Sequence, residues 1–434
     1  MAGELTIEII RRETIKPSSP TPSYLKSFKL SLLDQLSPAV YGPLVLFYPK
    51  NDVVTSEQRS HQLKKSLSKT LTLFYPLNGR LIDKTIDCDD EGAQYFEAKF
   101  KGHLSTFQEQ PEPETLKRFL PAESFSPTAG TRPLLLVQAT LFDCGGLAIG
   151  ICMSHKLADA ATVRIFLKSW AATSNGQAHQ ILPDLKAASY FPPKDVSLEG
   201  AKVELRKSQS VNVVKRYVFD ASKVAALKVI AASSSVQRPT RAEVVTALIW
   251  KCTMAAIALN SGSPSKHFVL SQIVNIRKRV DPPLPENCIG NLVGNVSTQT
   301  NNHTSDLQAL VTQIRKGLTE YTQNRAKRLK GDDAFQVIFE QYKEVGELMR
   351  RDDLHLMIST SLCNFGLYEV DFGWGKPSWV TIPIGTHYNV VTLIDTREGG
   401  VEAWVCLSKQ DMAFFERDPE LLAFSNTSIP NSAL

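Results

Sequence analysis

The sequence predicts an α/β protein of two domains, each combining β-strands with helices. Strand-like and helix-like segments occur on both sides of one weakly periodic stretch, residues 183–210, which is rich in Pro, Lys, Ser and Gly. The chain has 434 residues, of which 43% are hydrophobic and 21% charged, as in globular proteins with a sizeable core. We therefore expect an N-terminal domain at residues 1–185, a crossover linker at 186–212 and a C-terminal domain at 213–434.

The first half of the chain shows a helix, a pair of strands and a second helix. Leucines recur at helical spacing over residues 56–73, and Pro76 follows shortly after that stripe. Two apolar runs, residues 134–142 and 147–153, are joined by a short turn containing two glycines, which predicts antiparallel strands. Residues 158–173 then predict a helix with one apolar face.

The second half repeats this mixture of strands and helices. Strands are predicted at residues 213–219 and 267–275, and the tail from 380 to 405 is typical of β-structure. Apolar residues at helical spacing predict helices at 241–259, 307–318 and 335–349. The tail and these helices support a second domain of the same α/β class.

Charge and cysteine content limit the partners and the compartment. The net charge of +5, from 49 basic and 44 acidic side chains, is too small for a nucleic-acid protein but suits an anionic small ligand. Seven cysteines without CxxC spacing predict reduced thiols and no zinc site. We find neither a signal peptide nor an apolar run long enough to span a membrane, and we expect a cytoplasmic protein.

One segment has residue types suited to acid–base chemistry: Ser154-His155-Lys156-Leu157-Ala158-Asp159. It lies where an apolar strand ends and a helix begins, so His155 falls at an edge of the sheet. An imidazole there is a candidate general base, since its ordinary pKa is near neutral pH. The alternative is a structural histidine. Asp159 falls in the first helical turn, where it either orients His155 or, as we prefer, supports the helix start.

A second segment is Asp371-Phe372-Gly373-Trp374-Gly375, followed by Lys376 and Pro377. Two glycines around a tryptophan, with a proline after them, cannot continue a helix or a regular strand. On residue types alone, the segment predicts a tight turn with Trp374 in the core.

Together, in this order on one chain, the two segments resemble the plant BAHD acyltransferases, which carry a His-x-x-x-Asp motif and a C-terminal Asp-Phe-Gly-Trp-Gly motif. Further stretches resemble family elements along nearly the whole chain: Leu30-Ser-Leu-Leu-Asp34, Tyr75-Pro-Leu-Asn-Gly-Arg80, Phe142-Asp-Cys-Gly-Gly146, Asn275-Ile-Arg277 and Gly290-Asn291. Within the family, the residues of these stretches are most similar to those of the vinorine-synthase-like branch, whose members use acetyl-CoA.

This resemblance implies two chloramphenicol-acetyltransferase-like domains with mixed β-sheets and a channel between them. Acyl-CoA and the acceptor alcohol would enter from opposite faces and meet at His155 in a ternary complex, without metal or a bound cofactor. The resemblance also implies a monomer. By the family pattern, Asp159 turns away from the substrate toward an arginine, for which we expect Arg277.

The same resemblance gives provisional roles to the remaining motif residues. The Asp371–Gly375 segment would hold a loop away from the chemistry, while Trp374 could still support the oxyanion. Thr240 and Arg241, at the start of a predicted helix, are candidates for binding the phosphates of CoA, because helix N-termini favour anions. The alternative for Thr240 is a simple N-cap.

Departures from the family pattern bear on the acceptor. Asn364 stands where many members place Arg, and Leu362 stands where Trp is common. In shikimate-type hydroxycinnamoyl transferases an arginine near that place grips the acceptor carboxylate. Its absence here favours a neutral or bulky apolar acceptor.

The leading hypothesis is therefore an acetyl-CoA-dependent O-acetyltransferase of plant specialised metabolism, acting on a polycyclic alkaloid or terpenoid alcohol. A second hypothesis changes the donor to hydroxycinnamoyl-CoA or benzoyl-CoA. A third is a non-catalytic BAHD-like protein that binds or regulates a partner, which the intact His155 disfavours.

Overall fold

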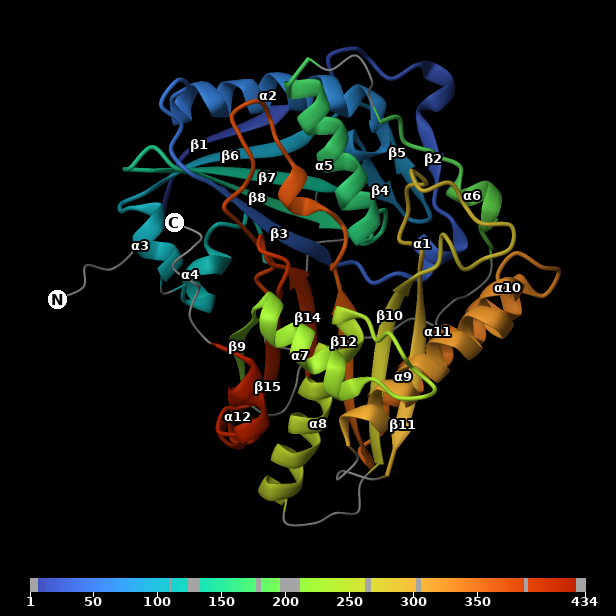
Figure 1. Ribbon diagram of the computed structural model, residues 1–434. Coiled ribbons are helices and arrows are strands. Elements are labelled where there is room, and N and C mark those ends of the chain that lie inside the picture. The colour runs from blue at the N-terminus through green and yellow to red at the C-terminus, as the bar shows by residue number, and fades with distance from the viewer. Residues whose placement is uncertain are drawn as a thin grey trace.

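The computed structural model describes residues 7–109, 111–123, 133–176, 181–195, 211–261, 267–301, 306–385 and 389–426. Two lobes are visible in Figure 1, each built on one six-stranded sheet. Both sheets combine parallel and antiparallel neighbours, which confirms the predicted α/β class with mixed sheets.

The first lobe is organised by a sheet whose central strands are buried on both faces. Its strands, in spatial order, are β1 (Ile7–Ile15), β6 (Ala93–Phe100), β7 (Leu135–Phe142), β8 (Leu147–Ser154), β3 (Tyr41–Tyr48) and β13 (Trp379–Thr381). A small second sheet of β2 (Ser27–Lys29), β5 (Thr85–Asp87) and β4 (Arg80–Ile82) lies beside it. Side chains alternate along β3, so Leu44 and Leu46 pack on one face while Val45 and Phe47 pack on the other.

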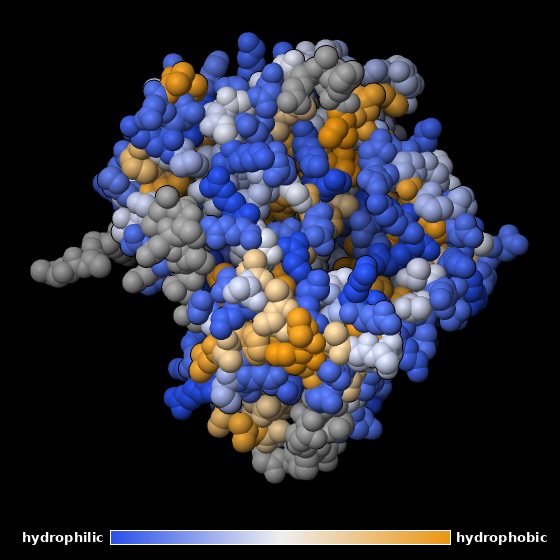
Figure 2. All heavy atoms as spheres, viewed as in Figure 1, coloured by the Kyte–Doolittle hydropathy of each residue, from blue (hydrophilic) through white to orange (hydrophobic). Residues whose placement is uncertain are grey.

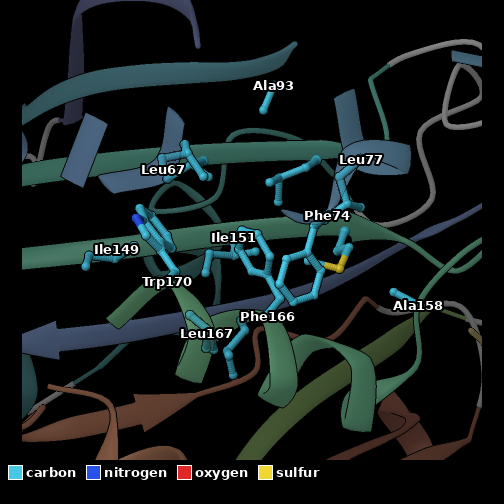
Figure 3. Close-up of a cluster of buried hydrophobic side chains, with 14 of the residues drawn as sticks. Leu67, Phe74, Leu77, Ala93, Ile149, Ile151, Ala158, Phe166, Leu167 and Trp170 are labelled. Atoms are coloured by element: carbon cyan, nitrogen blue, oxygen red, sulfur yellow. The ribbon is translucent and has the colours of Figure 1, made fainter. Parts of the chain in front are cut away.

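Helices cover both faces of this sheet. On one face lie α2 (Ser56–Leu73) and α5 (Ala160–Ser174), which pack against each other and bury Leu67, Phe166 and Trp170 (Figure 3). On the other face, α3 (Leu104–Glu109) and α4 (Pro113–Lys117) cover an aromatic cluster around Phe47.

The second lobe repeats this arrangement with a different strand order. Its sheet runs β11 (Val293–Thr300), β10 (His267–Asn275), β12 (Leu354–Ser361), β14 (Val390–Asp395), β15 (Val401–Ser408) and β9 (Asn212–Phe219). Its helices are α7 (Ala221–Ala231), α8 (Arg241–Ser261), α9 (Leu307–Glu320), α10 (Ala326–Arg328), α11 (Ala334–Arg350), α12 (Lys409–Phe415) and α13 (Pro419–Phe424). Among the described residues, α8 is long and apolar enough to cross a membrane, yet most of it is buried as the core helix of this lobe.

The lobes exchange segments with each other. Strand β13, which follows β12 in the chain, pairs with β3 of the first sheet through Trp379↔Phe47 and Thr381↔Val45. In the opposite direction, α1 (Leu32–Leu36) packs into an apolar cluster with Leu292 and Ile338 of the second lobe. Each half of the sequence therefore contributes structure to the other lobe.

The predicted elements differ from the observed ones mainly at their ends. The helix expected at 158–173 begins at Ala160, because Asp159 is its N-cap and lies just outside the helix. Within the linker expected at 186–212, a short helix, α6 (Ala187–Tyr190), is present, and residues 196–210 lie outside the described residues. The domain boundaries at 185 and 213 remain predictions.

Candidate active site

His155 lies in the turn between β8 and α5, where the first lobe meets the second (Figure 1). Its neighbour Ser154 pairs with Tyr41 of β3, and the backbone N–H of His155 donates to the Val40 carbonyl over 2.8 Å. The residue is partly exposed, whereas Ser154 before it is buried. The surface between the lobes is hollowed and lined largely by hydrophilic side chains (Figure 2). The channel implied by the family resemblance remains a prediction.

The hydrogen bond to the His155 ring fixes its tautomer. Nδ1 lies 2.8 Å from the Ala158 carbonyl oxygen, which can only accept, so Nδ1 carries the proton. Nε2 therefore keeps its lone pair. Burial lowers the pKa of His155 below 6.5 because it disfavours the imidazolium, although the Ala158 carbonyl and the Asp159 charge act in the opposite direction. The ring is thus neutral near pH 7, as a general base must be.

Asp159 points away from the imidazole and into a buried ion pair. Its carboxylate accepts from Arg277 Nη1 at 2.6 Å and Nη2 at 3.1 Å, and both side chains are almost fully buried. The same carboxylate accepts from the backbone N–H of Thr162, which caps α5, and from that of Leu292. The structure thus brings Arg277 to Asp159, the contact that the family resemblance implied, and this arrangement supports the turn that carries His155.

Asn291 also holds this turn, from the second lobe. Its side-chain amide donates to the His155 carbonyl at 3.1 Å and to the Ser37 hydroxyl at 2.9 Å. Its backbone N–H donates to the buried carboxyl of Asp34, whose pKa burial raises to about 6 despite hydrogen bonds from Ser31 and Asn291. In the sequence, Asn291 stands out only as part of a stretch that resembles a family element, and its isolated position gives no physical indication of this bond.

The Asp371–Gly375 segment is anchored on the first lobe, as the orange-red loop beside α2 and α5 in Figure 1 shows. Asp371 accepts from the backbone N–H groups of Gly373 and Gly375, both of which have φ of +107°. The Phe372 carbonyl accepts from Gln62 and Ser174, on α2 and α5. These bonds hold a turn with left-handed glycines, the structural role expected of the segment.

Trp374 lies in the core, and the oxyanion role that the resemblance left open for it remains a prediction. Its ring packs edge-on against Tyr48 and stacks on Phe372. Tyr48 and Tyr41 mark opposite ends of β3, and Tyr41 pairs beside His155. Seven residues at roughly 3.3 Å each separate them by about 23 Å. Trp374 is a core residue, as its residue type alone suggested.

Thr240 and Arg241, the candidates for CoA, are both engaged within the protein. Thr240 and Glu243 bond reciprocally as a capping box at the start of α8, which matches the N-cap alternative. Arg241 donates to Asp395 at 2.7 Å and to the Gly399 carbonyl at 2.8 Å. A role for either residue in binding CoA remains a prediction.

Asn364 lies beside Arg241 and Asp395, in the turn that follows β12. It is exposed, has a φ of +67° and accepts from Arg241 at 2.7 Å. Its backbone N–H donates to Asp395. The side chain therefore completes a turn after β12, and the neutral or bulky apolar acceptor inferred from Asn364 remains a prediction.

Gly42 is the residue near His155 that the sequence analysis missed. A Cβ atom added to it would lie 3.2 Å from His155 Nε2. A glycine inside a predicted strand often marks close approach of a ligand or another chain segment, and that signal could have found it.

Comparison with known proteins identifies the class. A profile of the Transferase family matches residues 5–422. An epi-neemfruitin B 7-O-acetyltransferase from Melia azedarach is 38% identical, covering 96% of this chain and 98% of the relative. Salutaridinol 7-O-acetyltransferase from Papaver somniferum is 36% identical, covering 94% and 96%.

Solved structures agree with the sequence relatives. The crystal structure of vinorine synthase superposes with a TM-score of 0.84 at 33% identity, covering 98% of this chain and 99% of that one. TRI101 of F. sporotrichioides, at 16% identity and a TM-score of 0.73, shares the fold. The chain belongs to the Transferase family, the BAHD acyltransferases, and it is an acyltransferase.

Proposed function

We propose that this enzyme transfers the acetyl group of acetyl-CoA to a hydroxyl of a polycyclic alkaloid or terpenoid alcohol, with His155 as the general base. The observation that carries the proposal is the imidazole at the junction of the lobes, whose Nδ1 is bonded to the Ala158 carbonyl so that Nε2 is left to accept a proton. Relatives named as O-acetyltransferases for salutaridinol and limonoids support the donor and the acceptor class.

The chemical step follows from this tautomer. Nε2 of His155 accepts the hydroxyl proton while the acceptor oxygen attacks the thioester carbonyl carbon. The tetrahedral intermediate collapses as the carbon–sulfur bond breaks, and the imidazolium returns the proton to the CoA thiolate. The products are an acetate ester and CoA thiol, and the histidine ends neutral. General-base catalysis of this kind contributes about 10²–10⁴-fold.

The supporting residues keep the base in place during this cycle. Asp159, Arg277 and the Asn291 amide hold the turn on both sides of the imidazole. We assign them positioning roles, because none of them contacts the ring nitrogens. Free cysteines throughout the described chain support a reducing compartment, and we place the enzyme in the cytoplasm as a monomer.

The test measures CoA thiol release by the purified protein with acetyl-CoA and a panel of fused-ring alcohols. His155→Ala should lower kcat by at least about 10²-fold. His61→Ala, which changes an exposed histidine on α2, is the matched control and should keep wild-type activity. A loss of less than about tenfold in His155→Ala would exclude the general-base role.

Competing donors in one reaction test the choice of acyl group. Preferred use of acetyl-CoA supports the proposal, whereas preferred use of benzoyl-CoA or a hydroxycinnamoyl-CoA would favour an aromatic acyl transferase. Absence of turnover with every donor would indicate a binding protein instead.

A further inference from the structure

The space beside the reactive nitrogen of His155 is bounded by a residue without a side chain. Gly42 lies on β3 opposite Met153 of β8, next to the Tyr41–Ser154 pair of the same ladder. A Cβ atom at position 42 would lie 3.2 Å from His155 Nε2 and 3.4 Å from Cε1. Its next neighbour, the Met153 carbonyl oxygen, would be 3.6 Å away, an ordinary contact. The methyl group of an alanine would therefore press on the imidazole edge and on little else.

The backbone does not require glycine at this position. Gly42 is absent from the glycines with left-handed φ, and its pairing with β8 keeps a regular register at the residues before and after it. Any L-residue can adopt this conformation. A glycine in a strand interior also weakens the strand, because it has no side chain to pack. The backbone conformation therefore does not account for a glycine here, whereas the need for room next to Nε2 does.

The residues around that space are not fully buried. Gly42, Pro43 and His155 are partly exposed, whereas Tyr41 and Ser154 beside them are buried. A reacting hydroxyl oxygen must come within about 2.6–3.2 Å of the base. The carbon that carries this hydroxyl, and the substituents of that carbon, must then lie within a few ångströms of the place where a side chain at position 42 would be.

We propose that Gly42 is a specificity-determining residue: its missing side chain leaves room beside His155 Nε2 for the two ring carbons that flank a secondary hydroxyl. A primary alcohol has one carbon substituent at the reacting centre, whereas a ring alcohol has two. The second substituent is the group for which the space is needed. This inference rests on the proposed function of His155 and adds the shape of acceptor that its surroundings admit.

The test compares Gly42→Ala with wild type on two matched acceptors. One is a tetracyclic alcohol with a secondary ring hydroxyl, and the other carries a primary hydroxymethyl group on the same ring. For the secondary alcohol, kcat/KM should fall by about 10–200-fold, the usual effect of one methyl group in a fitted site. For the primary alcohol the loss should stay below about threefold. Equal losses for both acceptors, or no loss for either, would overturn the proposal.

The matched control is Gly346→Ala on α11, where an added Cβ would meet only the flexible end of Arg350. It should leave both acceptors unaffected. If the acid limb of the kcat/KM–pH profile shifted in Gly42→Ala, the methyl group would have displaced the imidazole and not filled the acceptor space. That result would also count against the proposal.

A second readout does not depend on any acceptor. Diethylpyrocarbonate acylates neutral imidazole nitrogens, and peptide mass spectrometry follows His155 and the exposed His61 in one digest. Gly42→Ala should slow modification of His155 about tenfold relative to His61, because the methyl group covers Nε2. Unchanged modification would refute the claim about space even if wild type acetylates neither alcohol, an outcome that would instead contradict the proposed function.

Discussion

Asp159→Asn tests whether the buried ion pair beneath His155 stabilises the fold. The carboxylate accepts four hydrogen bonds: two from Arg277 and one each from the backbone N–H groups of Thr162 and Leu292. Asparagine has nearly the same shape, but it has no charge and only one acceptor oxygen. The Arg277 guanidinium, whose side chain is 2% exposed, would keep its charge without a carboxylate partner.

The expected cost follows from that geometry. Removing one partner of a buried pair destabilises a protein by about 3–5 kcal/mol, because the remaining charge stays buried. Asparagine still caps a helix nearly as well as aspartate, so the capping contribution changes little. Since typical stabilities are about 5–15 kcal/mol, this change is a large fraction of the total.

Equilibrium urea unfolding of the purified protein, followed by circular dichroism and tryptophan fluorescence, measures the effect. The matched control is Asp220→Asn: Asp220 caps α7 through the Lys223 N–H, but it is partly exposed to solvent and pairs with no buried arginine in the described structure. The control should lose less than about 1 kcal/mol. If Asp159→Asn unfolded at the same urea concentration as the control, the argument from the buried pair would be refuted.

Two further predictions concern the base and the distant tryptophan. Burial lowers the pKa of His155, and an imidazolium cannot accept a proton. The kcat/KM of the wild type should therefore fall toward acid pH with a midpoint below 6.5. A pH–rate profile with its midpoint at or above 6.5 would contradict this. Trp374→Phe should keep kcat within about twofold, since Trp374 lies in the core at the far end of β3, and should lower stability by less than the roughly 3–5 kcal/mol typical of Trp→Ala. A large loss of kcat with an intact fold would restore a role for Trp374 in the reaction.

Local patterns in the sequence predicted individual elements well. The helix predicted over 56–73 matches α2, and the strand predicted over 267–275 matches β10. Both are recognisable because the spacing of apolar residues follows the repeat of the local secondary structure. The turn with His155 and Asp159 was also predictable, since it joins two such elements. The helix start moved to Ala160 because a capping aspartate lies outside the helix it caps.

Contacts between distant segments were not predictable in the same way. The sequence indicated β-structure near residue 380. The alternation of side chains along a strand does not show which sheet the strand joins, so the pairing of β13 with the first lobe was not predictable. Gly42 lies beside His155 because of the register between β3 and β8, two strands about a hundred residues apart in the chain. The contact between Trp374 and Tyr48, which lie far apart in the chain, was not predictable for the same reason.

The exchanged segments explain how one turn can hold a base in a fixed orientation. The turn from Ser154 to Asp159 belongs to the first lobe, but Arg277, Asn291 and the Leu292 N–H reach it from the second. Strand β13 adds a ladder between the lobes, and the buried Glu402 accepts from Trp379 and Thr381 across the same junction. A hinge motion that separated the lobes would break these buried bonds at a cost of several kcal/mol. The turn that carries His155 is therefore held by residues of both lobes, and we expect substrates to reach it while the lobes stay joined. The space left by Gly42 then matters because a tightly held imidazole has little freedom to move aside.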